Sequence, residues 1–234
     1  MFQQSDQIAS IFYADGENLA NSLIPDNFSI KDIFRAISRQ YEAIDKLIDS
    51  FALRCKQSEV NIDCKKGCEF CCHQPVFANI QEILLVVDYI NSNFSVAQIE
   101  NIQTKALDKI KKIDATSVKE LLKYSHACPL LVDGACSVYP VRPMACRIYM
   151  SSDVNSCIRR YELEEEDSEF PSLFEFLLIA GRNMNRGFSE RLNNLNLQVT
   201  ENRLEVILYL ILSDIENQEK WLRGIEIIEN VNIE

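Results

Sequence analysis

Eight of the chain's nine cysteines fall in two short runs, and this pattern constrains the fold more than any other feature. The first run is Cys64-x3-Cys68-x2-Cys71-Cys72, and the second is Cys128-x7-Cys136-x9-Cys146-x10-Cys157. Cysteine is often buried as a small apolar residue, but core positions follow helix or strand periods, and these follow neither. Thiols gathered by short loops are typical of sites for a soft metal or an iron–sulfur cluster. We therefore expect a metal site that organises the surrounding chain.

The composition around these runs is that of an ordinary globular protein. Of the 234 residues, 47% are hydrophobic and 25% charged, so we expect one domain, residues 1–234, with its own apolar core. A net charge of −11 argues against binding to nucleic acid. The first residues show no basic stretch before an apolar run, and the longest apolar stretches, 83–87 and 206–212, are too short to cross a membrane. We therefore expect a cytoplasmic protein without membrane contact, in which thiolates bind metal rather than form disulfides.

The region 27–58, ahead of the cysteine runs, has the apolar period of an amphipathic helix. Its apolar positions recur every three or four residues, at Ile30, Ile33, Ile37, Tyr41, Ile44, Ile48, Phe51 and Cys55. Because Cys55 lies on this stripe, it is predicted to be a buried core thiol and not a ligand. Two more helices are predicted between the runs. One covers residues 79–93, and the other starts at Ser95, which forms an S-x-x-Q capping box with Gln98.

The region 170–222, after the second run, is also predicted to be helical. Pro171 and Ser172 are expected to open a helix that runs through Ile179. A further helix is expected to begin near Thr200. Its buried face is predicted to consist of Leu204, Ile207, Leu208, Ile211 and Ile215, with Trp221 in the core near its end.

Strand signals are weak, because no run alternates apolar and polar residues between turn dipeptides. The segment 124–157 holds three of the six prolines and is expected to be an ordered irregular loop. A loop of that length inside a compact domain needs something to organise it, which a metal would do. The predicted fold class is therefore mainly α: a single helical domain with a long irregular cysteine-rich loop region organised by metal.

All eight clustered cysteines are predicted metal ligands, within a metal-binding region of residues 64–157. They can divide into two four-ligand sites, or into one four-ligand cluster plus four others. Cys71 and Cys72 are adjacent, so we expect their side chains to point apart. Either they serve two centres, or one is a ligand and the other a supporting or redox-active thiol. His73 and His126 lie beside the runs and could ligate, but a surface or hydrogen-bonding role is favoured for both.

One shorter motif also fits a known enzyme class. Cys64-x3-Cys68-x-Phe70-Cys71 matches the CxxxCxΦC signature of radical S-adenosylmethionine enzymes. Those enzymes need alternating strands and helices after the motif, whereas this chain offers helices and a cysteine-rich loop. A radical enzyme of that fold is therefore disfavoured.

The combined pattern resembles a different family. The residues that carry the resemblance are the first cysteine run, Cys128-Pro129-Leu130, Gly134-Ala135-Cys136, Tyr139-Pro140-Val141-Arg142-Pro143-Met144-Ala145-Cys146-Arg147 and Cys157. Together they look like the CxxxCxxCC cysteine-cluster proteins, also called the YkgJ-type zinc- or iron-chelating family. The resemblance covers residues 64–157 and implies a metal site formed by the eight cysteines. More distantly, the region is similar to the cluster region of flagellin lysine N-methylases, which implies a protein (lysine) methyltransferase that uses S-adenosylmethionine with the cluster.

Three residues of this segment are candidates for binding a cofactor. Tyr139, Arg142 and Arg147 could hold an anionic substrate or a cofactor carboxylate, although structural bracing through hydrogen bonds is favoured for the two arginines. No catalytic residue can be assigned from the sequence. We expect a metal-binding protein with an iron–sulfur cluster, of the [4Fe–4S] type, in a redox or cluster-supported role. The alternatives are the methyltransferase and a zinc-stapled interaction module, and the expected partner is a protein substrate or a redox protein.

Overall fold

The computed structural model describes residues 2–65, 67–114, 125–161 and 170–228, and within them the fold is mainly α-helical, as predicted. In chain order the elements, with η for 3-10 helices, are α1 (Phe2–Leu23), α2 (Ile30–Gln57), η1 (Phe70–His73), β1 (Phe77–Asn79), α3 (Ile80–Asn93), α4 (Val96–Asp114), β2 (Leu131–Val132), β3 (Ala135–Cys136), η2 (Tyr139–Val141), α6 (Met144–Ile148), α7 (Val154–Tyr161), α8 (Glu175–Asn194), β4 (Glu201–Arg203), α9 (Leu204–Ser213) and α10 (Glu216–Leu222).

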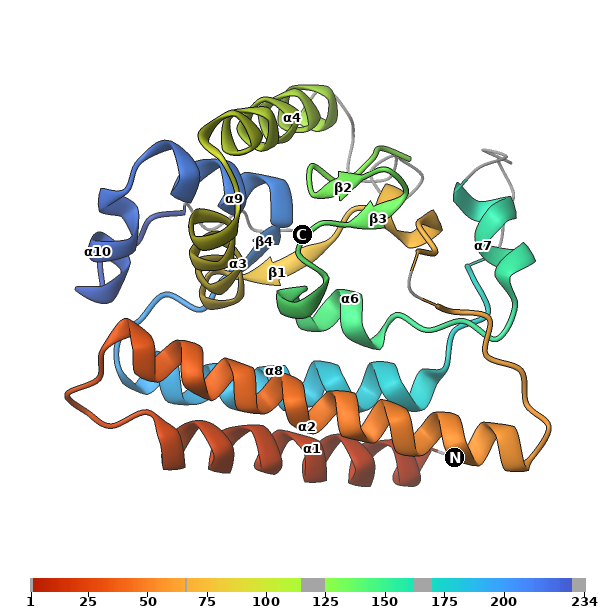
Figure 1. The fold of residues 1–234 in the computed structure, drawn as a ribbon. Helices are drawn as coiled ribbons and strands as arrows, with labels where there is room; N and C mark the ends of the chain where they lie inside the picture. The colour runs from red at the N-terminus through yellow and green to blue at the C-terminus, as the bar shows by residue number, and fades with distance from the viewer. Residues whose placement is uncertain (1, 66, 115–124, 162–169, 229–234) are drawn as a thin grey trace.

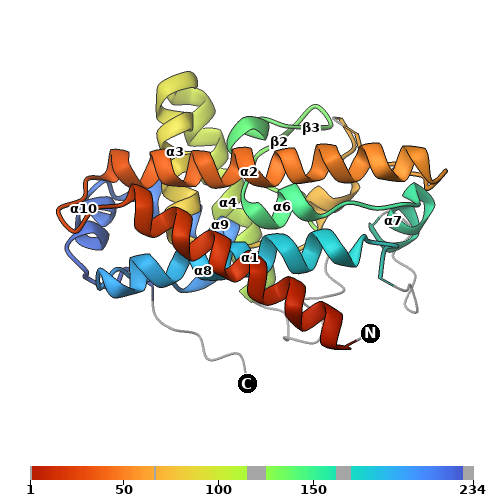
Figure 2. The same ribbon diagram turned by 90° about the horizontal axis from the view of Figure 1, so that it is seen from below.

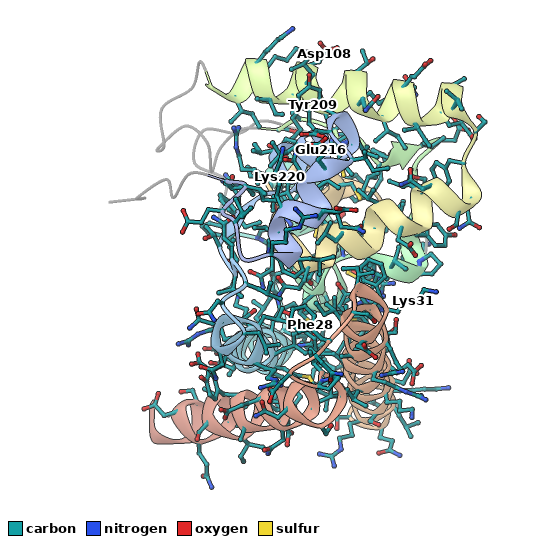
Figure 3. All side chains as sticks on the ribbon, turned by 90° about the vertical axis from the view of Figure 1, so that its left-hand side faces the viewer. Phe28, Lys31, Asp108, Tyr209, Glu216 and Lys220 are labelled. Atoms are coloured by element: carbon teal, nitrogen blue, oxygen red, sulfur yellow. The ribbon has the colours of Figure 1, made fainter. Side chains whose placement is uncertain are left out.

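The long helices α1, α2 and α8 lie side by side and form one layer of the molecule (Figure 1). Seen from below, α1 crosses α8 obliquely with α2 alongside (Figure 2). The second layer has two ends, with α3, α4, α9 and α10 toward one end and β2, β3, α6 and α7 toward the other. Figure 3 shows this helical end, with Asp108 of α4 and Tyr209 of α9 on the side away from α1. The cysteine region thus rests on the helical layer from above.

Local sequence features account for the start and the buried face of helix α2. Asp32 accepts a 2.9 Å hydrogen bond from the Ser29 amide and completes a capping box at the helix start. The predicted apolar stripe faces the core, and Ile33 and Ile44 are fully buried. Cys55 is also buried on this helix, which confirms the interpretation of its thiol as a core group.

The two predicted helices between the cysteine runs are present as α3 and α4. Asn79 and Glu82 form a capping box at the start of α3, and Ser95 and Gln98 pair at the start of α4. Strand β1, just before α3, pairs antiparallel with β4, just before α9, with Phe77 opposite Arg203. This short sheet brings α3 and α9 together in the core.

The prediction for the helix after the second run is wrong in its bounds. Pro171 and Ser172 do not open it, because this segment is extended: Ser152 donates to the Ser172 carbonyl, and Leu173 forms a bridge with Ser151. Helix α8 starts at Glu175 and continues well past Ile179, to Asn194.

Helix α8 continues through glycines that would be expected to end a helix, and the close contact these glycines make with α1 explains why. A Cβ atom on Gly187 would overlap the carbonyl oxygen of Tyr13 in α1, and one on Gly16 of α1 would overlap that of Met184 in α8. The two helices therefore touch backbone to backbone. Helix α1 itself was not predicted from the sequence.

The last predicted helix is also corrected. Residues from Glu201 to Arg203 form β4, so α9 starts at Leu204 and not near Thr200. Helix α9 ends at Ser213 and α10 begins at Glu216, and Ile215 between them is 87% exposed. The prediction that Ile215 lies on the buried face was therefore wrong. Trp221 is fully buried, as predicted, and its Nε1–H donates a 2.8 Å hydrogen bond to the Gln198 carbonyl.

The cysteine-rich segment is more regular than predicted. Its described part, from residue 125, contains the β2–β3 hairpin, η2, α6 and the start of α7. The paired strands are only two residues each, too short for an alternating pattern to show in the sequence. Within the described residues no helix combines the length and the apolar character needed to cross a membrane.

Candidate metal centre

Backbone hydrogen bonds join the two cysteine runs. The Cys128 amide donates to the Cys72 carbonyl at 2.8 Å, and the His126 amide donates to the His73 carbonyl at 2.7 Å. The 3-10 helix η1 and the chain entering β2 are therefore held side by side. This pairing fixes the start of the second run against the end of the first.

The β2–β3 hairpin places two further cysteines near this junction. Cys136 on β3 pairs with Leu131 on β2, whose amide donates to the Cys128 carbonyl at 3.0 Å. Burial raises the pKa of Cys128 to about 12, and a hydrogen bond from the Leu130 amide to its sulfur opposes the rise. Burial also raises the pKa of Cys136, opposed in the same way by the Val138 amide. Amides that point at sulfur in this way stabilise a thiolate and so suit a metal ligand.

Cys146 lies on the short helix α6, whose start is held by a buried carboxylate. The Met144 amide donates to Glu82 Oε1 at 2.7 Å, and Glu82 is 2% exposed. The Tyr41 hydroxyl donates to the same oxygen at 2.9 Å, and Asn185 Nδ2 donates to the other at 3.1 Å. Glu82 thus binds the first turn of α6 while it also caps α3.

Arg147 of α6 acts as a brace. Its Nε donates to the Arg142 carbonyl at 3.0 Å, its Nη2 to the Pro140 carbonyl, and its Nη1 to Asp45 of α2 at 2.5 Å. Its guanidinium also stacks over the Tyr41 ring at 4.0 Å. These contacts tie α6 to η2 and to α2, in keeping with the structural role that the sequence favours.

The other two candidates for cofactor binding lie together. The Arg142 guanidinium stacks over the Tyr139 ring at 3.9 Å, and its Nη1 donates to the Tyr139 carbonyl at 2.9 Å. Both residues, and Arg147, border the same cavity as the cysteines. Their binding of a substrate or cofactor anion stays a prediction.

The start of the first run is tied to α7. The Ser151 amide donates to the Cys64 sulfur at 3.1 Å, and the Asp63 amide donates to the Ser151 carbonyl at 3.1 Å. The Val154 amide, at the start of α7, donates to Asp63 Oδ2 at 2.8 Å. Cys157 follows one turn later on α7 and is 5% exposed. Cys64 and Cys157 are thereby held near each other.

A cavity of about 420 Å³ lies between these elements, lined by seven of the eight predicted ligands. They are Cys64, Cys68, Cys71, Cys72, Cys128, Cys136 and Cys146. Cys157, His73, His126 and Cys55 do not border the cavity. His126 instead lies 3.3 Å from the Lys112 ammonium, and burial, followed by that charge, lowers its pKa. The structure therefore brings the cysteines together without the histidines.

Cys71 and Cys72 lie next to each other on the 3-10 helix η1, and both border the cavity. A side-chain interaction with Cys71, followed by burial, raises the pKa of Cys72. That the two side chains point apart stays a prediction.

A pair of tyrosines borders the cysteines near α7. The Tyr161 hydroxyl donates to Gln74 Oε1 at 2.6 Å, so the Tyr149 hydroxyl donates to Tyr161 across the 2.6 Å between them. Burial raises the pKa of both phenols, and the negative charges of Cys71 and Cys157 add to the rise. These tyrosines are therefore neutral hydrogen-bonding groups beside the thiols.

The residues that line the cavity suit a soft metal, because seven of them are cysteines with soft thiol ligands. Among the residues that the structure describes, no group of three or more His, Cys, Asp or Glu side chains is placed to hold a metal ion. Seven of the eight thiols border the cavity.

Sequence reasoning missed two charged residues that support the site. Glu82 is the only carboxylate between Ile80 and Val87. The Asn79-x-x-Glu82 capping box was the sequence pattern from which its role could have been predicted. Lys109 of α4 is 2% exposed and lies 3.9 Å from Glu205 of α9. Its signal was a lysine on the apolar face of an amphipathic helix.

Comparison with known families agrees with this picture. Residues 63–170 match the family model CxxCxxCC, described as "Putative zinc- or iron-chelating domain". The matched residues include all eight clustered cysteines, so the resemblance found in the sequence is confirmed there. No curated protein and no solved structure matches the chain significantly.

Proposed function

We propose that the cysteine cavity of this protein binds an iron–sulfur cluster in a redox role, because residues 63–170 match the family model described as "Putative zinc- or iron-chelating domain". The observation that carries the proposal is the placement of the thiols. Seven cysteines border one cavity of about 420 Å³.

A cluster and a single zinc ion require different distances between the ligand sulfurs. Four thiolates bound to one zinc at about 2.3 Å have their sulfurs only about 3.8 Å apart. In an iron–sulfur cluster each thiolate binds a different iron, so the sulfurs are held farther apart around the inorganic core. A cavity bordered by thiols suits the second arrangement.

The charges around the cavity suit an anionic cluster. A four-thiolate cluster carries a negative net charge, which cations and amide donors can offset. Lys65, Arg142 and Arg147 border the cavity together with Asp45 and Asp49, and the amides of Leu130 and Val138 act to lower the pKa of Cys128 and Cys136. Bound there, the cluster would supply one-electron chemistry, and the protein would set its potential through these donors.

The test is anaerobic reconstitution of the full chain with iron and sulfide, followed by metal and sulfide analysis and visible and electron paramagnetic resonance spectra. We expect a brown protein with iron and acid-labile sulfide. The variant Cys55→Ala is the matched control, because this cysteine is buried outside the cavity, and it should bind as much iron as the wild type. A colourless protein that retains stoichiometric zinc and no sulfide would overturn the proposal.

The alternative use of the same cluster, S-adenosylmethionine-linked methylation, has its own test. Titration of S-adenosylmethionine into the reconstituted protein, followed by calorimetry and by the spectrum of the reduced cluster, reports cofactor binding directly. Heat release together with a changed spectrum would favour the methyltransferase. No binding would leave electron transfer as the role.

A further inference from the structure

We propose that Lys109 of α4 is a buried counter-charge of the metal site, a cation that the fold holds beside Cys128 to offset the negative charge of the loaded centre. This inference deepens the proposed function and rests on it for the nature of the metal. The position of Lys109 rests on the contacts that α4 makes, and it is the same for any metal that the thiolates bind.

Helix α4 lies along the chain that enters the β2–β3 hairpin (Figure 1). The Lys105 ammonium donates to the Leu131 carbonyl at 3.4 Å, and the Lys112 ammonium lies 3.3 Å from His126 Nε2. The earlier lysine thus meets the later residue of the chain, and the later lysine meets the earlier residue. One face of α4 therefore runs antiparallel to this chain.

Lys109 lies between these two contacts on the same face of the helix. Residues three and four positions apart are neighbours on a helix face, and Lys109 follows Lys105 by four positions and precedes Lys112 by three. In the antiparallel chain, Cys128 likewise falls between the two residues that the outer lysines meet. The Cys128 amide is in turn bonded to the Cys72 carbonyl. Lys109 is therefore level with the junction of the two cysteine runs.

Lys109 differs from the two outer lysines of this face in being buried. It is 2% exposed, whereas Lys105 and Lys112 are exposed. An ammonium loses its hydration on burial, so it needs a negative charge nearby. The carboxylate of Glu205 in α9 is 1% exposed and lies 3.9 Å away. Leu204, the residue before Glu205, lines the cysteine cavity, so this ion pair lies close to the cavity wall.

Glu205 holds Lys109 by charge without occupying its hydrogen-bond donors. The 3.9 Å between the ammonium and Glu205 Oε2 is longer than a hydrogen bond, and among the described residues neither oxygen of this carboxylate has a hydrogen-bond partner. Arg203 lies 3.7 Å from Oε1 and shares in neutralising the carboxylate. The ammonium therefore keeps donors for a second acceptor, and a Cys128 thiolate bound to metal is an acceptor at the same level of the helix.

A buried cation in this place acts on the charge of the loaded site. Four thiolates that bind a [4Fe–4S] core or one zinc ion carry a net negative charge, which a nearby ammonium offsets. A reduced cluster is one charge more negative than the oxidised cluster, so the cation stabilises the reduced state more. We therefore expect Lys109 to raise the reduction potential of the cluster.

The test compares variants of the full chain after anaerobic reconstitution with iron and sulfide. Lys109→Met removes the charge and keeps a long side chain, whereas Lys109→Arg keeps the charge. Lys111→Met is the matched control, because Lys111 is an exposed lysine on another face of the same helix. Lys109→Gln, whose amide can still donate to Glu205, is the second neutral variant if circular dichroism shows that Lys109→Met does not fold. Redox titration followed by electron paramagnetic resonance measures the potential.

Loss of the charge at Lys109 should favour the oxidised cluster by about tenfold, which is a shift of about 59 mV to lower potential for one electron. Lys109→Arg and Lys111→Met should keep the potential of the wild type. A folded neutral variant with the wild-type potential would overturn the proposal. An equal shift in Lys109→Arg would also overturn it, because the effect would then come from packing and not from charge.

A protein that carries zinc without sulfide would refute the iron–sulfur assignment but leave the role of Lys109 open to the same variants. The measurement is then zinc affinity, determined by competition with a chromogenic chelator. We expect Lys109→Met to bind zinc about tenfold more weakly than the wild type and Lys111→Met, because the thiolates lose their counter-charge. Equal zinc affinity in all three proteins would overturn the role of Lys109 as well.

Discussion

The amide of Met144, which lies two residues before Cys146, donates a 2.7 Å hydrogen bond to the buried carboxylate of Glu82. This contact joins the first turn of α6 to α3, the most buried helix of the core. The carboxylate also accepts from Tyr41 and Asn185, so its charge is met by several neutral donors. The position of one predicted metal ligand therefore depends on a polar group deep in the apolar layer.

Replacing Glu82 with alanine should destabilise the protein by about 3 kcal/mol, because the Tyr41 hydroxyl and the Met144 amide lose their buried acceptor. Urea denaturation of the metal-free protein measures the change. Glu42→Ala is the control: that carboxylate is 52% exposed and paired with Arg39, so its loss should cost no more than about 0.5 kcal/mol. Equal midpoints for the two variants would contradict the role of Glu82.

The sequence predicts one part of this arrangement and not the other. The period of α2 and the capping boxes of α3 and α4 are local signals, readable because the residues that interact lie within a few positions of each other. That Glu82 binds α6, far along the chain, is a tertiary contact without a sequence period. The eight cysteines were found from their spacing, but which of them border one cavity depends on how η1, β2–β3 and α6 come together in the fold.

Helices α1 and α8 touch through glycine, so Gly16→Ala should cost about 2 kcal/mol. The added methyl group would overlap the Met184 carbonyl, and the backbones would have to separate. Thermal unfolding followed by circular dichroism measures the loss. Ser10→Ala, at an exposed position of the same helix, is the control and should leave the unfolding temperature within a degree or two. A Gly16→Ala protein as stable as the control would refute the close packing.

The same glycines explain an error of the sequence analysis. Gly181 and Gly187 lie in a stretch of α8 rich in asparagine and arginine, which lowers the local helix propensity. Packing against α1 and α6 supplies the stabilisation that propensity does not, because side-chain-free positions let the partner approach. Packing against α1 and α6 therefore keeps α8 helical beyond the point at which its local sequence predicts an end.

Arg147→Lys should destabilise the protein by about 2 kcal/mol although the charge is kept. Lysine cannot reach the Arg142 and Pro140 carbonyls and Asp45 at the same time, and it loses the stacking on Tyr41. The ion pair itself contributes little, because Asp45 is 45% exposed. Chemical denaturation of Arg147→Lys beside Arg39→Lys, whose arginine is on the surface, separates bracing from charge. Equal losses in the two variants would assign Arg147 no bracing role.

Removing the metal should loosen the cysteine region and spare the helical layer. The segments 67–73 and 125–161 are short elements around a thiol-lined cavity, so without metal their packing loses the ligand bonds that the thiols would make. Helices α1, α2 and α8 are long, and their contacts involve apolar side chains and glycines, with no cysteine ligand. Hydrogen exchange of the loaded and chelated proteins should therefore show faster exchange in 67–73 and 125–161, with little change in α1, α2 and α8. The unfolding temperature should fall on chelation, because the metal binds only the folded site. A uniform loss of protection would show that the metal stabilises the whole molecule, whereas unchanged exchange around the cysteines of a protein shown to carry metal would contradict the prediction.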